Sequence, residues 1–196
     1  MGVDAFLLCS MFVQSLLLDT GMSRGYEMKL LESMPARVAV CEQVAHSANA
    51  RGIDWELMVS LSFEESRYSS KVKSWAGAVG PMQVLPKYHC PGKKSEGCDL
   101  IKAGLDAWEK WSARVSKKDP LRTETILCHY NAGNKCTKSG RKYARRIIGR
   151  LWRMKRRAEY TKRQVSMSLC IDNKTGDLVS RAFGGCLDLK PLRSVQ

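Results

Sequence analysis

The sequence predicts a mainly α-helical fold with a small β element near residues 72–88. Apolar residues recur at helical spacing in several segments, whereas residues 69–88 are rich in Ser, Gly and Pro and hold only short apolar stretches. The 196 residues suffice for one globular domain with a tail, and a hydrophobic fraction of 44% suffices for its core. No apolar run reaches the roughly 18 residues of a membrane-spanning helix, which excludes a polytopic membrane protein.

The N-terminal region, residues 1–36, is an apolar segment with more than one interpretation. Residues 5–18 resemble the apolar core of a secretory signal, or an anchor. Asp4 stands where Lys or Arg is usual, and no small-x-small cleavage site follows. A helix packed on the body of the domain, or a true start at Met22 or Met28, would also explain the segment.

The next two helices place a carboxylate in an unusual position. A helix is expected over residues 37–50, and Gly52 ends it. Asp54 is the expected N-cap of the following helix. The apolar stripe of that helix, which includes Leu61, then runs into Glu65, where an apolar residue would continue it.

Three further helices are expected after the central region. Their ranges are 99–116, 121–132 and 141–160. Gly133 and Gly140 are expected to bracket the loop before the last of them.

The expected domain therefore spans residues 37–160, and residues 161–196 form a C-terminal tail. Within the tail, residues 173–176 read Asn-Lys-Thr-Gly, which predicts the turn of a hairpin.

The charge of the chain is strongly positive, with 33 Lys and Arg against 19 Asp and Glu. Twelve of the cations lie between Lys138 and Arg163, with Glu159 as the single acid among them. Such a field attracts polyanions, so we expect attraction to anionic envelope polymers, or else a merely solvated helix face. Specific nucleic-acid recognition is not expected, because only Trp152 and Tyr160 interleave the basic residues.

The eight cysteines favour disulfides in an oxidising compartment, because their number is even. Two similar units, Cys90-x7-Cys98 and Cys128-x7-Cys136, have longer gaps than the two to four residues usual in zinc sites, so no metal is expected. A further pair, Cys170 and Cys186, brackets the tail and is placed to close it. The pairing itself stays open.

Four polar residues, Glu65, Gln83, Tyr130 and Asn131, have the chemistry that a glycan cleft would need. Partial burial at the end of an apolar stripe raises the pKa of a carboxyl group such as Glu65, and a carboxyl protonated near neutral pH is a general acid. Gln83, Tyr130 and Asn131 offer neutral hydrogen bonds that suit sugar hydroxyls and acetamido groups.

The order and spacing of these residues match a known pattern over about residues 37–155. The pattern is a Glu-Ser pair, a Ser nine residues after the Glu, Gly-Ala-x-Gly-x-Met-Gln-x-x-Pro, then Tyr-Asn-Ala-Gly and a further Tyr. The chain matches it at Glu65, Ser66, Ser74, Gly77, Ala78, Gly80, Met82, Gln83, Pro86, Tyr130, Asn131, Ala132, Gly133 and Tyr143. Pro81 departs from the usual Leu. This arrangement resembles the catalytic domain of the soluble lytic transglycosylases, glycoside hydrolase family 23, in the lysozyme-like superfamily.

The resemblance implies an α+β lysozyme-like fold without cofactors that acts on peptidoglycan glycan strands. It implies that Glu65 is the single catalytic acid and base, which cleaves the β-1,4 bond between N-acetylmuramic acid and N-acetylglucosamine and leaves 1,6-anhydro ends. The implied substrate contacts are Ser74, Met82, Gln83, Tyr130, Asn131 and Tyr143. The implied structural or orienting residues are Ser66, Gly77, Ala78 and Gly80.

Glu64 is the rival acid, but neighbouring helical side chains point about 100° apart, and the stripe selects Glu65. A goose-type-like muramidase would need a second carboxylate, for which Asp99 or Asp106 is available. A catalytically silent glycan-binding or virion module and a basic nucleic-acid-binding protein are rival functions of a different class. We expect a monomer that is exported to the periplasm or envelope, or is associated with a phage.

Overall fold

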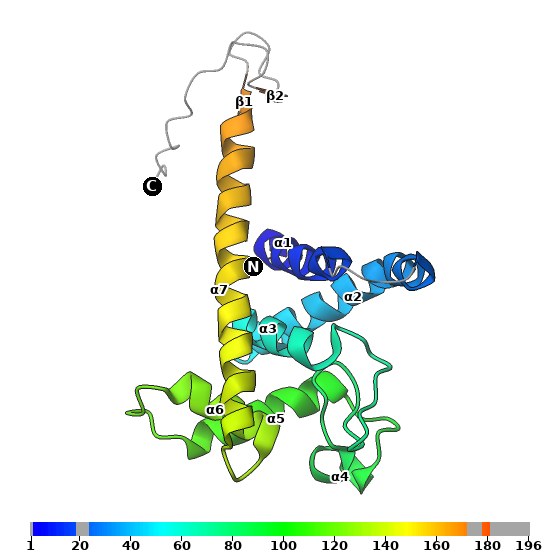
Figure 1. Cartoon of the computed structure of the whole chain (residues 1–196), viewed down its shortest axis with the longest axis vertical. Coiled ribbons are helices and arrows are strands. Elements are labelled where there is room, and N and C mark those ends of the chain that lie inside the picture. Colours follow the sequence, from blue (N-terminus) through cyan, green and yellow to red (C-terminus); the bar gives the residue numbers. More distant parts are fainter. Residues whose placement is uncertain (1, 19–23, 172–177, 181–196) are drawn as a thin grey trace. The chain divides into compact units, whose positions relative to one another are not determined.

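The computed structural model describes residues 2–18, 24–171 and 178–180, with side chains for 5–17 and 28–160 (Figure 1). The described chain is mainly helical, as predicted. Its elements are α1 (Gly2–Gln14), η1 (Ser15–Leu18), α2 (Arg24–Ala50), α3 (Trp55–Ser66), α4 (Pro86–His89), η2 (Pro91–Lys93), α5 (Leu100–Arg114), α6 (Arg122–Ala132), α7 (Lys138–Ser168), β1 (Leu169–Ile171) and β2 (Leu178–Ser180). The chain divides into two units, Met1–Met154 and Lys155–Gln196.

The first unit is built around α2, which packs against α1, α3 and α5 (Figure 1). A disulfide between Cys9 and Cys41 joins α1 to α2. The ring of Phe12 lies 5.2 Å from that of Phe63 in α3. The structure thus has the N-terminal segment as a helix packed on the body, and α2 begins well before residue 37.

α3 begins and ends as local chemistry dictates. The Asp54 side chain accepts a hydrogen bond from the Leu57 amide at 3.1 Å, which confirms the predicted N-cap. The buried face includes Met58 and Leu61. The helix ends at Arg67, whose φ of 56° is left-handed.

The expected β element near residues 72–88 is reduced to two isolated bridges, Lys73 to Val79 and Val79 to Val84. The chain turns too often here for a continuous ladder, because Gly77, Gly80 and Gln83 all have positive φ. The one sheet of the described residues is the antiparallel pair β1 and β2 in the second unit. The predicted turn at residues 173–176 lies outside the described residues.

Disulfides are confirmed within both repeated units, Cys90 to Cys98 and Cys128 to Cys136. The Cys9 to Cys41 bond was not predicted, because nothing in the spacing of these residues relates them. The predicted closure of the tail depends on Cys186, which lies outside the described residues.

Gly140 was wrongly expected in a loop, since α7 already begins at Lys138. The Thr137 hydroxyl accepts a hydrogen bond from the Gly140 amide at 3.1 Å, which caps the helix. A Cβ atom at Gly140 would lie 2.8 Å from Cys128 Sγ, so close packing against α6 explains this glycine. In the part of the chain that the structure describes, no helix combines the length and apolar character needed to cross a membrane.

Candidate active site

A cavity of about 350 Å³ lies between the C-terminal end of α3, the loop of residues 69–85, and helices α4, α5 and α6. Its polar lining is Glu65, Ser74, Gln83, His89, Tyr130 and Asn131. Its apolar lining is Trp75, Ala76, Ala78, Val84, Leu85, Ala107 and Trp111. The predicted residues Glu65, Ser74, Ala78, Gln83, Tyr130 and Asn131 therefore share one cavity, although they come from three separate segments.

Glu65 lies in the last turn of α3 and is the one carboxylate on the cavity among the described residues. The pKa of Glu65 is raised to about 7, chiefly by burial and in smaller part by the nearby charge of Glu64. A hydrogen bond from Tyr143 acts in the opposite direction. At neutral pH the carboxyl group is therefore divided between its protonated and charged forms, as a general acid requires.

Tyr143 reaches Glu65 from α7. Its hydroxyl donates a hydrogen bond to Glu65 Oε1. The ring is buried, and burial raises the pKa of Tyr143 well above its ordinary value, so the phenol keeps the proton that it donates. Tyr143 does not line the cavity, and its contact is with the carboxyl group.

Glu64 lies on a different face of α3, where it forms ion pairs with arginines. Its Oε1 lies 2.8 Å from Arg146 Nε and its Oε2 lies 3.0 Å from Arg150 Nη2. Arg67 is a third, more distant partner at 3.9 Å. With its side chain 10% exposed and ion-paired to α7, Glu64 is absent from the cavity lining.

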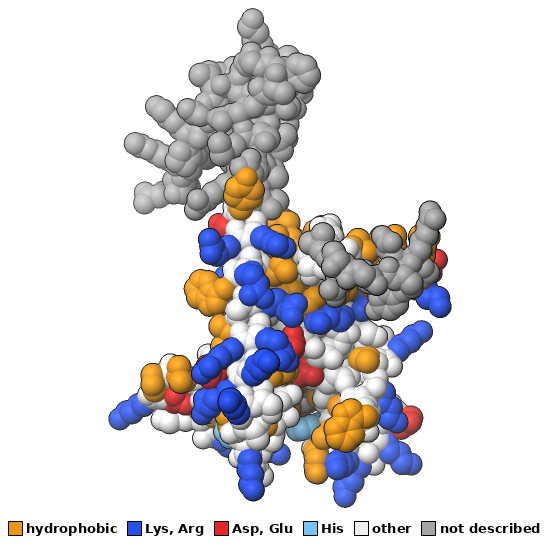
Figure 2. All heavy atoms as spheres, in the orientation of Figure 1, with side chains coloured by type: hydrophobic (Ala, Val, Ile, Leu, Met, Phe, Trp, Pro, Cys, Tyr) orange, Lys and Arg blue, Asp and Glu red, His pale blue; other side chains and the backbone are white. Residues whose placement is uncertain are grey.

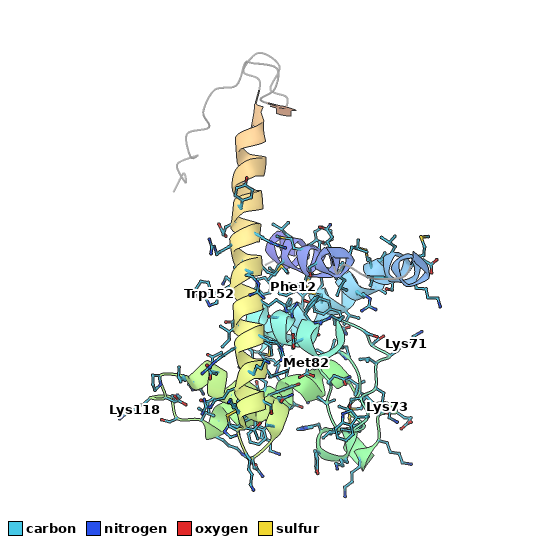
Figure 3. All side chains as sticks on the ribbon, in the orientation of Figure 1. Phe12, Lys71, Lys73, Met82, Lys118 and Trp152 are labelled. Carbon is cyan, nitrogen blue, oxygen red and sulfur yellow. A yellow bond between two sulfur atoms is a disulfide. The ribbon has the colours of Figure 1, made fainter. Side chains whose placement is uncertain are left out.

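Met82 and Tyr130 connect the loop to α6. The Tyr130 hydroxyl donates to the Met82 carbonyl at 2.8 Å. The Met82 side chain is fully buried, so it has no exposed surface for a substrate (Figure 3). It packs against Gly104 of α5, where a Cβ atom would approach Met82 Cβ to 2.5 Å. Gly104 is a residue that the sequence reasoning missed, although a lone glycine within a helical pattern was the available signal.

Ser66 and Gly80 shape the turn around Pro81. Ser66 Oγ donates to the Pro81 carbonyl at 2.8 Å, and the buried Ser62 Oγ donates to the same oxygen at 3.1 Å. At Gly80, φ is 76°, and a Cβ atom would lie 2.5 Å from Leu100 Cδ1. A larger residue here would be strained by the left-handed backbone and would have to displace the Leu100 side chain.

Gln83 holds the loop as well as lining the cavity. Its amide nitrogen donates to the Val72 carbonyl at 3.2 Å and to the Gly80 carbonyl at 3.0 Å. Its φ of 47° is uncommon for a residue other than glycine. Such strained conformations gather at functional sites, where surrounding contacts maintain them.

Two tryptophans and His89 line the cavity without having been predicted as site residues. Trp111 falls in the helix expected over residues 99–116, where most tryptophans at helical spacing belong to the apolar face. Trp75 directly follows the motif residue Ser74, and this adjacency was the missed signal. Burial lowers the pKa of His89, with the charge of Lys110 acting in the same direction.

The chemistry of the cavity is that of an acid in a neutral polar setting. Among the described residues, no group of three or more His, Cys, Asp or Glu side chains is arranged to hold a metal ion.

No family model, curated protein or solved structure matches the chain. The function must therefore be inferred from these residues and their surroundings.

Proposed function

We propose that the protein is a peptidoglycan lytic transglycosylase with a lysozyme-like fold. The observation that carries this proposal is Glu65, which has a pKa near 7 and is the single acid among the described residues of a cavity otherwise lined by neutral groups. The motif resemblance supplies the substrate, the bond between N-acetylmuramic acid and N-acetylglucosamine.

In the first step, protonated Glu65 gives its proton to the glycosidic oxygen, and the bond from that oxygen to C1 breaks. The N-acetyl group of the substrate supports the positive charge that develops at C1, as in substrate-assisted glycosidases. The resulting Glu65 carboxylate keeps the hydrogen bond from Tyr143, which stabilises the newly formed charge.

In the second step, the Glu65 carboxylate takes the proton from the C6 hydroxyl of muramic acid. The C6 oxygen then bonds to C1 and closes the 1,6-anhydro ring. Glu65 ends the cycle protonated, and no water is consumed.

Muramidase action is the second candidate, but both carboxylates available for it are bound to other groups. Asp99 accepts hydrogen bonds from the Ile101 and Lys102 amides and so serves as the cap of α5. Asp106 pairs with Arg51 at 2.6 Å and with Lys102 at 2.9 Å. Neither lines the cavity, so neither is positioned to orient a water molecule at C1.

Two further properties fit an enzyme that works on the cell wall. The disulfides suit a protein exported to the periplasm or envelope, or carried by a phage. Lys and Arg side chains gather over α7 within the first unit (Figure 2), where they would attract anionic envelope polymers. Their solvated positions equally suit an ordinary helix surface, so the proposal does not depend on them.

The deciding experiment is mass spectrometry of purified peptidoglycan digested by the wild type, by Glu65→Gln and by Asp106→Asn. Anhydromuramic ends from the wild type and from Asp106→Asn, and none from Glu65→Gln, would support the proposal. Hydrated reducing ends would favour the muramidase. No cleavage by the wild type would leave the silent glycan-binding module.

A further inference from the structure

Trp75 is the most exposed large apolar side chain that the structure describes. Its relative exposure is 100%, yet it contributes to the lining of the cavity that holds Glu65. A side chain that is both fully exposed and part of the lining stands at the rim of the cavity. Single exposed apolar residues are common on proteins, so exposure by itself does not indicate a site, and the position and support of Trp75 matter more.

The turn that presents Trp75 is held by three hydrogen bonds. The Ser74 amide donates to the Ala78 carbonyl at 2.8 Å, and the Gly77 amide donates to the Ser74 carbonyl at 3.0 Å. The Ala78 amide donates to Ser74 Oγ at 3.0 Å. The backbone under Trp75 is therefore fixed, although the indole itself packs on nothing.

The second indole of the cavity, Trp111, is held in place by its ring contacts. Its ring stacks on His129 with centroids 5.3 Å apart and an interplanar angle of 14°. The guanidinium of Arg114 lies 4.9 Å from the ring centroid. The cavity thus combines one fixed indole ring, Trp111, and one indole on a fixed turn, Trp75, with neutral hydrogen-bonding groups.

We propose that Trp75 forms a saccharide-binding subsite at the rim of the cavity, where its indole stacks on the ring of an N-acetylated pyranose. One face of such a sugar is mostly C–H groups, which suit an aromatic plane, and its edge carries the polar groups that Ser74 and Asn131 can bind. The inference rests on the proposed function, since the sugar belongs to the same glycan strand that Glu65 would cleave.

The test measures glycan binding separately from cleavage. Isothermal titration calorimetry with a tetramer of β-1,4-linked N-acetylglucosamine is run on Glu65→Gln, alone and combined with Trp75→Ala or with Trp152→Ala. Trp152 is the matched control, because it is 64% exposed on α7 and does not line the cavity (Figure 3). Because the Trp75 side chain is fully exposed, its removal loses no packing contacts. Glu65→Gln and Glu65→Gln/Trp75→Ala should therefore have the same melting temperature.

Trp75→Ala should weaken binding about three- to tenfold, while Trp152→Ala leaves it unchanged. The subsite is overturned if the double variant Glu65→Gln/Trp75→Ala binds within twofold of Glu65→Gln alone. It is also overturned if Glu65→Gln alone binds neither the tetramer nor purified peptidoglycan.

The failure of the subsite and the failure of the enzyme give different results. Anhydromuramic products together with unchanged binding by Trp75→Ala would remove the subsite and leave the enzyme. Binding that depends on Trp75, without any cleavage by the wild type, would remove the enzyme and leave a glycan-binding protein.

Discussion

The two faces of α3 at its C-terminal end carry the same side chain in opposite surroundings. On one face, Glu64 is surrounded by the guanidinium groups of Arg146, Arg150 and Arg67. On the other face, Glu65 meets one tyrosine hydroxyl and a cavity. The difference teaches that the neighbours decide what a carboxyl group does, since cations hold one as a structural anion and burial prepares the other as an acid.

One helix supplies both surroundings. Tyr143, Arg146 and Arg150 all belong to α7, and the helix delivers the tyrosine to Glu65 and the arginines to Glu64. Replacements on the Glu64 face should therefore change chiefly the folding stability, whereas replacements on the Glu65 face should change properties that depend on the protonation of Glu65.

The largest expected effect is the loss of stability in Glu64→Gln. Removing the charge leaves Arg150, whose side chain is 23% exposed, without its anion. We expect the free energy of unfolding to fall by about 3–4 kcal/mol, because breaking a largely buried ion pair leaves an uncompensated charge. Urea unfolding at neutral pH measures the change.

Glu124→Gln is the matched control for this substitution. Glu124 also binds two arginines of α7, but the side chains of Arg141 and Arg145 are 41% and 67% exposed. The Glu124 side chain is itself as buried as that of Glu64, so the two sites differ only in the exposure of their arginines. The loss of Glu124 should cost about 1 kcal/mol, because its arginines stay hydrated without the anion. Equal losses in the two variants would mean that the exposure of the arginine partners does not decide the cost.

The next effect is a gain of stability in Glu65→Gln at high pH. The pKa of Glu65 rises from 4.5 to about 7 on folding, so between these values the folded state binds more protons and stability falls as pH rises. Gln carries no charge to bury and can still accept from Tyr143. We expect the variant to be about 2–3 kcal/mol more stable at pH 8 and equal to the wild type near pH 4. A difference that is independent of pH would contradict the raised pKa.

A smaller effect concerns the pH dependence of cleavage. Because the acid form of Glu65 starts the reaction, kcat/KM should fall as pH rises through about 7. The Tyr143 hydrogen bond lowers the pKa of Glu65. Tyr143→Phe should therefore raise that pKa and move the decline in kcat/KM to higher pH. An unmoved decline would mean that the hydroxyl acts on geometry alone.

How much the sequence could predict follows from how local each feature is. The Asp54 cap depends on residues a few positions away, and the structure has it as predicted. The surroundings of Glu64 depend on Arg146 and Arg150, more than eighty positions away, and no local pattern indicates that pairing. The motif resemblance brought Tyr143 to the site despite the same distance, because it carries long-range information that periodicity lacks.

The smallest effect links the two faces. The charge of Glu64 raises the pKa of Glu65, so Glu64→Gln should lower it. The arginines that the substitution leaves unpaired act in the same direction, because a nearby cation favours the charged carboxylate. The decline in kcat/KM should thus move to lower pH in Glu64→Gln, opposite to Tyr143→Phe, and stay in place in Glu124→Gln. Circular dichroism recorded at each pH shows whether Glu64→Gln is folded, which separates this electrostatic effect from unfolding. A shift of the same sign in Glu64→Gln and Tyr143→Phe would mean that both substitutions act by disturbing the helix end and not through charge.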